Sequence, residues 1–84
     1  MSSNEIADRA RALYESDIRS RVEAGNVGRY IVIDIGSEDF EIGDDFLLPT
    51  RAVRGRHPEG LLHTIRIGYP VAGRIGGKAT PARR

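Results

Sequence analysis

Two residues of this 84-residue chain, His57 and His63, have side chains whose ordinary pKa lies close to neutral pH. An enzyme of this size would depend on one of them as a general acid or base. His63 alternates with apolar residues in a predicted strand, which is typical of a structural histidine, and His57 precedes Pro58 in a predicted loop. Ser37 lies in a predicted turn without the elbow motif that activates a nucleophilic serine. We therefore expect no enzymatic activity.

The acidic residues of the middle segment could in principle bind a hard cation. They are Asp34, Glu38, Asp39, Glu41, Asp44 and Asp45. A calcium loop needs oxygen ligands at alternating positions of a single turn, whereas these acids are divided between two predicted strands and the start of a helix. The pattern favours a solvated hairpin face or a partner surface, so we expect neither a metal ion nor another cofactor. Asp44 and Asp45 suit the N-terminus of the helix that follows them.

Opposite charges are concentrated in opposite halves of the chain. Residues 1–50 contain 11 of the 12 acids and 5 of the 13 basic residues, and residues 51–84 contain one acid and 8 basic residues. The net charges of −6 and +7 favour a charged partner or self-association through complementary faces.

Seven of the eight basic residues in the second half are arginines, which pair in a bidentate manner with phosphates and carboxylates. This composition leaves nucleic-acid binding as an alternative function. The residues predicted for it are Arg54, Arg56, Arg66, Arg74 and Lys78. The segment 73–76 has the glycine spacing of the backbone-clamping loop in KH domains, but no aromatic stacking motif accompanies it.

Residues 4–24 have the pattern of an amphipathic helix. Ser2 and Glu5 form a capping-box sequence, and Gly25 is typical of a helix end. Asp17 and Arg21 fall within the apolar sector of the helical wheel. The sequence therefore predicts one of two arrangements. Either these two residues leave a polar notch in the core, or this face of the helix extends past the core into a subunit contact.

The rest of the pattern predicts an α+β fold. Residues 29–35 are typical of a central strand, and residues 39–42 predict a second strand that returns beside it. A helix over residues 46–53 follows, which Pro49 should shorten or kink, and residues 61–67 predict a third strand. In this α-β-β-α-β order, the long N-terminal amphipathic helix packs on a three-stranded mixed sheet.

Residues 1–77 are predicted to form a single domain, followed by a disordered basic tail over residues 78–84. A domain of this size buries only about 60% of the surface of its unfolded chain, and the sequence has no cysteine for a disulfide. We therefore expect a homodimer or a complex with a protein partner. The predicted contact residues are Leu13, Tyr14, Asp17, Arg21, Phe40 and Tyr69.

The longest apolar run, residues 31–33, is much shorter than a membrane span. Residues 1–25 alternate in charge too often for a signal sequence. The sequence therefore predicts a cytoplasmic protein without a membrane partner.

Three segments carry a resemblance to a known group of proteins. They are residues 28–34 (GRYIVID), 39–45 (DFEIGDD) and 66–70 (RIGYP). Together they resemble a family of small uncharacterised bacterial proteins, of about 70–85 residues, with a strand, an acidic hairpin, a short helix and an Arg-hydrophobic-Gly-Tyr end. The resemblance covers residues 10–77 and implies an antitoxin-like or partner-binding role. It assigns no catalytic residue.

Overall fold

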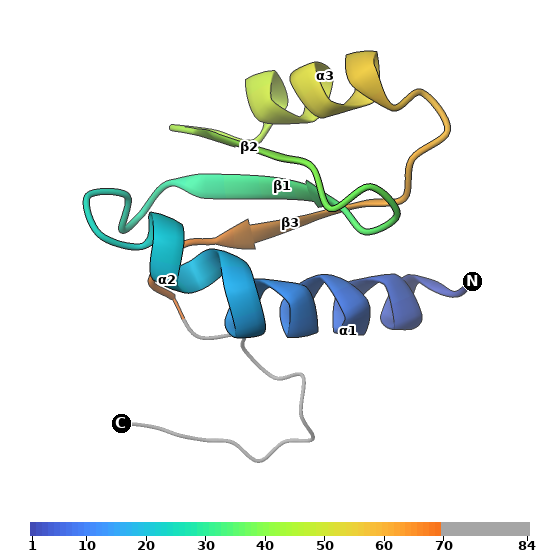
Figure 1. Ribbon diagram of the computed structural model, residues 1–84. Coiled ribbons are helices and arrows are strands. Elements are labelled where there is room, and N and C mark those ends of the chain that lie inside the picture. Colours follow the sequence, from blue (N-terminus) through green and yellow to red (C-terminus); the bar gives the residue numbers. More distant parts are fainter. Residues whose placement is uncertain (70–84) are drawn as a thin grey trace.

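The computed structural model describes residues 1–69. A long helix over residues 3–22 lies along one side of a three-stranded sheet, and a second helix lies on the other side (Figure 1). The elements are α1 (Ser3–Leu13), η1 (Tyr14–Ile18), α2 (Arg19–Val22), β1 (Tyr30–Asp34), β2 (Phe40–Gly43), α3 (Leu47–Arg56) and β3 (Leu62–Arg66). The predicted α+β class is confirmed. The predicted tail, residues 78–84, lies outside the described residues.

The start of the long helix follows the predicted capping box. The Ser2 amide donates to Glu5 Oε1 at 2.8 Å, and the Glu5 amide donates to Ser2 Oγ at 3.2 Å. At the other end, Gly25 has a φ of +82°, a conformation that glycine adopts at little cost. Local hydrogen bonds and backbone preferences therefore account for both ends of this helix.

A π-helical segment, η1, interrupts the long helix. Within it the Arg19 amide donates to the Tyr14 carbonyl, five residues earlier. The wider turn changes the direction of the side chains around it. Tyr14 is buried, whereas Asp17 and Arg21 are exposed and form an ion pair of 3.2 Å on the surface. The polar notch that the straight helical wheel predicts is therefore absent from the core.

The sheet has the strand order β2-β1-β3, and both neighbouring pairs are antiparallel. The prediction of a mixed sheet is wrong. β2 and β3 do run in the same direction, but they lie on opposite sides of β1. Because α3 carries the chain across β1, no two parallel strands become neighbours.

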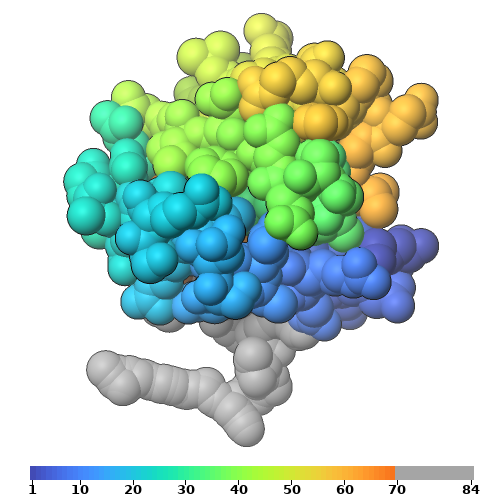
Figure 2. All heavy atoms as spheres, viewed as in Figure 1, coloured from blue at the N-terminus to red at the C-terminus, as the bar shows by residue number. Residues whose placement is uncertain are grey.

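The two faces of the sheet are covered by different helices. On one face, Ile31 and Ile33 of β1 pack with the long helix, and Ile65 and Ile67 complete this core with Tyr14, Ile18 and Val22. On the other face, a Cβ added at Gly43 would lie 2.7 Å from Pro49 Cγ, which places α3 close to β2. Figure 2 shows the hairpin residues (green) filling the space between the long helix (blue) and α3 (yellow).

Pro49 is accommodated in the first turn of α3. Amides in the first turn of a helix have no partner within the helix, so the missing N–H of proline breaks no hydrogen bond there. Asp45 Oδ1 accepts hydrogen bonds from the Leu47 amide at 3.0 Å and the Leu48 amide at 3.4 Å, as expected of a helix cap. The whole helix spans ten residues, so Pro49 does not interrupt it.

None of the helices within residues 1–69 has the length and apolar character that crossing a membrane requires.

Candidate functional site

A buried carboxylate, Asp34 at the end of β1, organises the loops at one end of the sheet. Only 4% of the residue is exposed. Its carboxylate accepts hydrogen bonds from the Ser37 hydroxyl at 2.7 Å, the Leu61 amide at 3.1 Å, and the Gly36 and Ser37 amides at 3.3 Å. A Cβ added at Gly60 would lie 2.9 Å from Asp34 Oδ1, so glycine is needed for this close approach. Asp34 thus joins the β1–β2 turn to the start of β3.

A second set of polar contacts joins the end of α3 to β2. Arg56 donates from Nε to Asp39 Oδ2 at 2.7 Å and from Nη1 to Glu41 Oε2 at 2.9 Å. His57 Nε2 lies 2.8 Å from Asp39 Oδ2. The polar clamp, defined as Asp34, Ser37, Asp39, Arg56 and His57, fixes the end of α3 against the hairpin.

The clamp contains the residue types of a serine–histidine–aspartate site, but its hydrogen bonds differ from those of such a site. Ser37 Oγ donates its proton to the Asp34 carboxylate and lies 3.3 Å from His57 Nε2. That nitrogen is closer to Asp39, and His57 Nδ1 lies 3.7 Å from Asp34 Oδ2, beyond hydrogen-bond distance. The geometry favours a structural role for these residues. Within residues 1–69, no group of three or more histidine, aspartate or glutamate side chains could hold a metal ion.

The clamp predicts acid sensitivity. Hydrogen bonds from Arg56 and His57 lower the pKa of Asp39 to about 2. Burial opposes ionisation of Asp34, but its hydrogen bonds from Ser37, Gly36 and Leu61 outweigh this effect and lower its pKa too. In the unfolded chain both carboxyl groups titrate near pH 4. Their contribution to stability is therefore complete above about pH 4 and is lost as the pH falls toward 2.

Urea unfolding between about pH 6 and pH 2 measures this effect. We expect the free energy of unfolding to fall steeply below about pH 4, and to fall less steeply in Asp39→Asn. Equal slopes in the variant and the wild type would contradict the role of Asp39.

The start of α3 exposes three consecutive large apolar side chains. The exposed fractions are 58% for Phe46, 51% for Leu47 and 68% for Leu48. We call these three residues the α3 patch. They are exposed because α3 uses Pro49 and Val53 as its buried side. Consecutive exposed apolar residues of this size are typical of an interaction surface.

Beside the α3 patch lies a row of aromatic and guanidinium groups. The rings of Phe46 and Tyr30 meet edge to face, with centroids 6.3 Å apart. The guanidinium carbon of Arg66 lies 5.4 Å from the centroid of the Tyr30 ring and 4.1 Å from that of Tyr69. We call Tyr30, Arg66 and Tyr69 the arginine row. Because Tyr30 pairs with Arg66 in the sheet register, both side chains lie on the α3 side of the sheet.

No protein-family model matches this chain, and neither does any curated protein or solved structure. The family resemblance of its three segments therefore remains a prediction.

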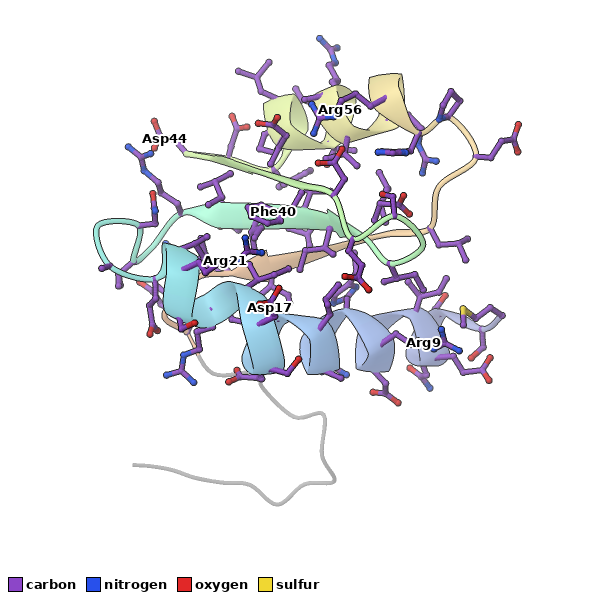
Figure 3. All side chains as sticks on the ribbon, in the orientation of Figure 1. Arg9, Asp17, Arg21, Phe40, Asp44 and Arg56 are labelled. Carbon is purple, nitrogen blue, oxygen red and sulfur yellow. The ribbon has the colours of Figure 1, made fainter. Side chains whose placement is uncertain are left out.

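The six predicted partner-binding residues do not form one surface. Asp17, Arg21 and Phe40 lie close together between the long helix and β2 (Figure 3), with the Arg21 guanidinium carbon 5.7 Å from the centroid of the Phe40 ring. Phe40 is half-buried on the face of the sheet that the long helix covers. Tyr69 belongs to the arginine row instead. The remaining two, Leu13 and Tyr14, are half-buried and buried, respectively.

The residues predicted for nucleic-acid binding are engaged within the chain where the structure describes them. Arg54 donates to the carbonyls of Pro58 at 3.0 Å and Gly60 at 2.8 Å. Arg56 belongs to the polar clamp, and Arg66 to the arginine row. The last two, Arg74 and Lys78, lie outside the described residues, as does the predicted KH-like segment 73–76.

Sequence reasoning missed the α3 patch because it placed these apolar residues on the second helix without predicting which side of that helix is buried. A usable signal was present. Pro49 and Val53 are spaced i, i+4 and can fill one narrow buried side, which leaves the preceding apolar residues on the outside.

Proposed function

We propose that this protein is a small interaction module that pairs with a second copy of itself through α3. The observation that carries the proposal is the exposure of the α3 patch, Phe46, Leu47 and Leu48, next to the half-buried Tyr30. Aromatic and large apolar side chains supply most of the binding free energy in protein interfaces. Covering this patch would remove apolar surface from water, a favourable change for a chain with a small core.

A glycine on the same helix supports a helix-to-helix contact. Gly55 is exposed within α3, and a Cβ added there would have no heavy atom within 4 Å. Glycine inside a helix is less favourable than alanine by about 1 kcal/mol. No contact in the described chain explains why this position lacks a side chain. Leu48, Ala52 and Gly55 follow the spacing i, i+4, i+7, so Gly55 would allow close approach of a second α3 along the line that begins at Leu48.

The charges around α3 favour an antiparallel arrangement of two such helices. Asp44 and Asp45 precede the helix, and Arg54 and Arg56 lie in its last turn. A two-fold axis near Ala52 would place Leu48 of each copy against Gly55 of the other. It would also bring the acidic start of each helix toward the basic end of its partner. Antiparallel packing also places the positive end of each helix dipole near the negative end of its neighbour.

The test is the molar mass in solution, measured by size-exclusion chromatography with light scattering over a range of protein concentrations. We expect a dimer that dissociates on dilution, and we expect Leu48→Lys to remain monomeric. Leu61→Lys is the matched control, because Leu61 is also exposed but precedes β3. A wild-type protein that remains monomeric up to about 1 mM would exclude the proposed dimer, since such a protein would associate with a free energy weaker than about 4 kcal/mol.

A second candidate function, nucleic-acid binding, is favoured by the arginine row. The exposed Tyr69 ring can stack on bases, and a guanidinium group can stack on bases and pair with phosphate. We expect a labelled single-stranded RNA to bind in about 20 mM salt and to bind much more weakly in about 200 mM salt. Arg66→Ala should weaken binding about tenfold, whereas Arg9→Ala, an exposed arginine on α1, serves as the control. Absence of saturable binding at low salt would remove this candidate.

A further inference from the structure

The strand β3 forms an open edge of the sheet. It is the last strand in the order β2-β1-β3, and it pairs with β1 in a regular antiparallel register. The Ile35 amide donates to the Leu61 carbonyl, and the Ile67 amide donates to the Arg29 carbonyl. Because bonded and non-bonded residues alternate in an antiparallel pair, the odd-numbered residues of β3 bond to β1. The main-chain groups of the even-numbered residues therefore point away from the sheet. We call these residues, Leu62, Thr64 and Arg66, the β3 edge.

The β3 edge lacks the features that usually protect an edge strand from pairing. No strand among residues 1–69 lies on its outer side. Proteins protect such edges with proline, lysine or a bulge, and β3 has none of these, since its register is regular over Leu62–Arg66. The β-branched Thr64 and Ile65 favour an extended backbone. An open edge of this kind suits the addition of an extended segment, whose main chain continues the hydrogen bonding of the sheet.

The side chains of the β3 edge lie on the α3 side of the sheet, but α3 itself packs against β2 and β1 (Figure 1). Thr64 and Arg66 are exposed, and Leu62 is half-buried. Just before the strand, Leu61 is 43% exposed. A strand added beside β3 would place every second side chain next to these residues. The edge therefore offers an apolar contact at its start and a positive charge at its end.

The charge of the β3 edge indicates which kind of segment fits it. Residues 61–69 include Arg66 and His63 but no acidic residue. The Arg66 guanidinium group donates to the Gly28 carbonyl at 3.2 Å, and no carboxylate among residues 1–69 forms an ion pair with it. A cation on an edge strand favours an acidic side chain directly opposite it. The β3 strand of a second copy has no acidic residue to offer, so the charge favours a different, acidic chain.

We propose that the β3 edge binds an extended acidic segment of a partner protein, which joins the sheet as a further antiparallel strand. The segment has an acidic residue opposite Arg66 and an apolar residue opposite Leu62. Its main chain exchanges hydrogen bonds with Leu62 and Thr64 and accepts one from the Arg66 amide. The Arg66 carbonyl already accepts from the Tyr69 amide at 3.2 Å. Main-chain bonds supply affinity, and the two side-chain contacts supply selectivity.

The test uses the full-length protein and the synthetic peptide acetyl-SEVTVLS-amide. In antiparallel register its glutamate lies opposite Arg66, its threonine opposite Thr64 and its leucine opposite Leu62. Hydrogen exchange is followed by NMR. We expect the Thr64 amide to exchange rapidly in the free protein and at least about tenfold more slowly with saturating peptide. The Ile65 amide, which points toward β1, should exchange slowly in both states. Slow exchange of the Thr64 amide in the free protein would show that the edge is already covered, and would overturn the proposal.

Two N-methylated forms of the peptide test the main-chain contact without any change to the protein. Methylation at the threonine removes the amide that donates to the Thr64 carbonyl. Methylation at the valine after it alters an amide that points away from β3. The dissociation constant should rise about tenfold in the first peptide and less than about twofold in the second. Equal affinities of the two methylated peptides would show that the peptide does not bind as a strand.

Reversing the charge tests the choice of an acidic segment. The wild type should bind acetyl-SKVTVLS-amide about fivefold more weakly than the glutamate peptide, and Arg66→Glu should reverse this preference. Arg9→Glu makes the same change of charge at an exposed residue of α1, so it should retain the wild-type preference. Equal binding of both peptides to the wild type would overturn the assignment to acidic segments, and absence of saturable binding would exclude the site. None of these results depends on α3, so they do not bear on the proposed dimer.

Discussion

Replacing Asp34 by alanine should destabilise the fold by about 3 kcal/mol. The variant removes the shared acceptor of the Gly36, Ser37 and Leu61 amides, whose hydrogen bonds to Asp34 are partly buried. Each donor that loses a partly buried partner is unfavourable by about 1 kcal/mol or more, and water entering the loop region compensates part of this loss. For a domain of this size, the midpoint of thermal unfolding should fall by about 15 °C.

Thermal and urea unfolding of Asp34→Ala and Asp44→Ala compare a buried acid with an exposed one. The Asp44 side chain is 88% exposed and forms an ion pair of 3.2 Å with Arg29. An exposed ion pair contributes at most about 1 kcal/mol, so Asp44→Ala should unfold near the wild-type midpoint. If the free energy of unfolding of Asp34→Ala is less than about 1 kcal/mol below that of the wild type, the polar clamp does not hold the loops together.

Gly55→Gln should have two effects of opposite sign. Glutamine is a better helix former than glycine, so the monomer should become more stable by about 0.5 kcal/mol. The same side chain would occupy the space where a second α3 approaches, so the dimer should weaken at least about tenfold. Few substitutions separate folding from association in this way, because most changes at an interface affect both in the same direction.

Unfolding is measured at a concentration low enough for the protein to be monomeric, and association is measured by sedimentation equilibrium at higher concentrations. Ala12→Gln introduces the same side chain at an exposed position of α1 and should leave association unchanged. A dimer of Gly55→Gln as strong as that of the wild type would exclude α3 from the contact, even if the wild type proves to be dimeric.

The sequence by itself predicts the elements whose cause is local. The Ser2–Glu5 capping box and the positive φ of Gly25 occur where the sequence predicts the ends of the long helix. Asp45 accepts a hydrogen bond from the first turn of α3, at the predicted start of that helix. The run of β-branched residues predicted as a strand forms the central strand β1. Each of these features depends on residues within about one turn or one strand, so a short window of sequence contains the information.

Only the tertiary structure decides how these elements face one another. The π-helical turn moves Asp17 and Arg21 to the surface, and packing against the sheet selects Pro49 and Val53 as the buried side of α3. The antiparallel pairing of β1 with β3 depends on which side of β1 the returning strand occupies.

The candidate sites follow from these same choices. The exposed α3 patch depends on which side of a helix is buried, and the arginine row combines residues that are distant in the sequence. Local propensity determines the type and the ends of each element. The orientation of each element is set by the burial of apolar surface over the whole domain, and the buried surface is a property of the assembled fold.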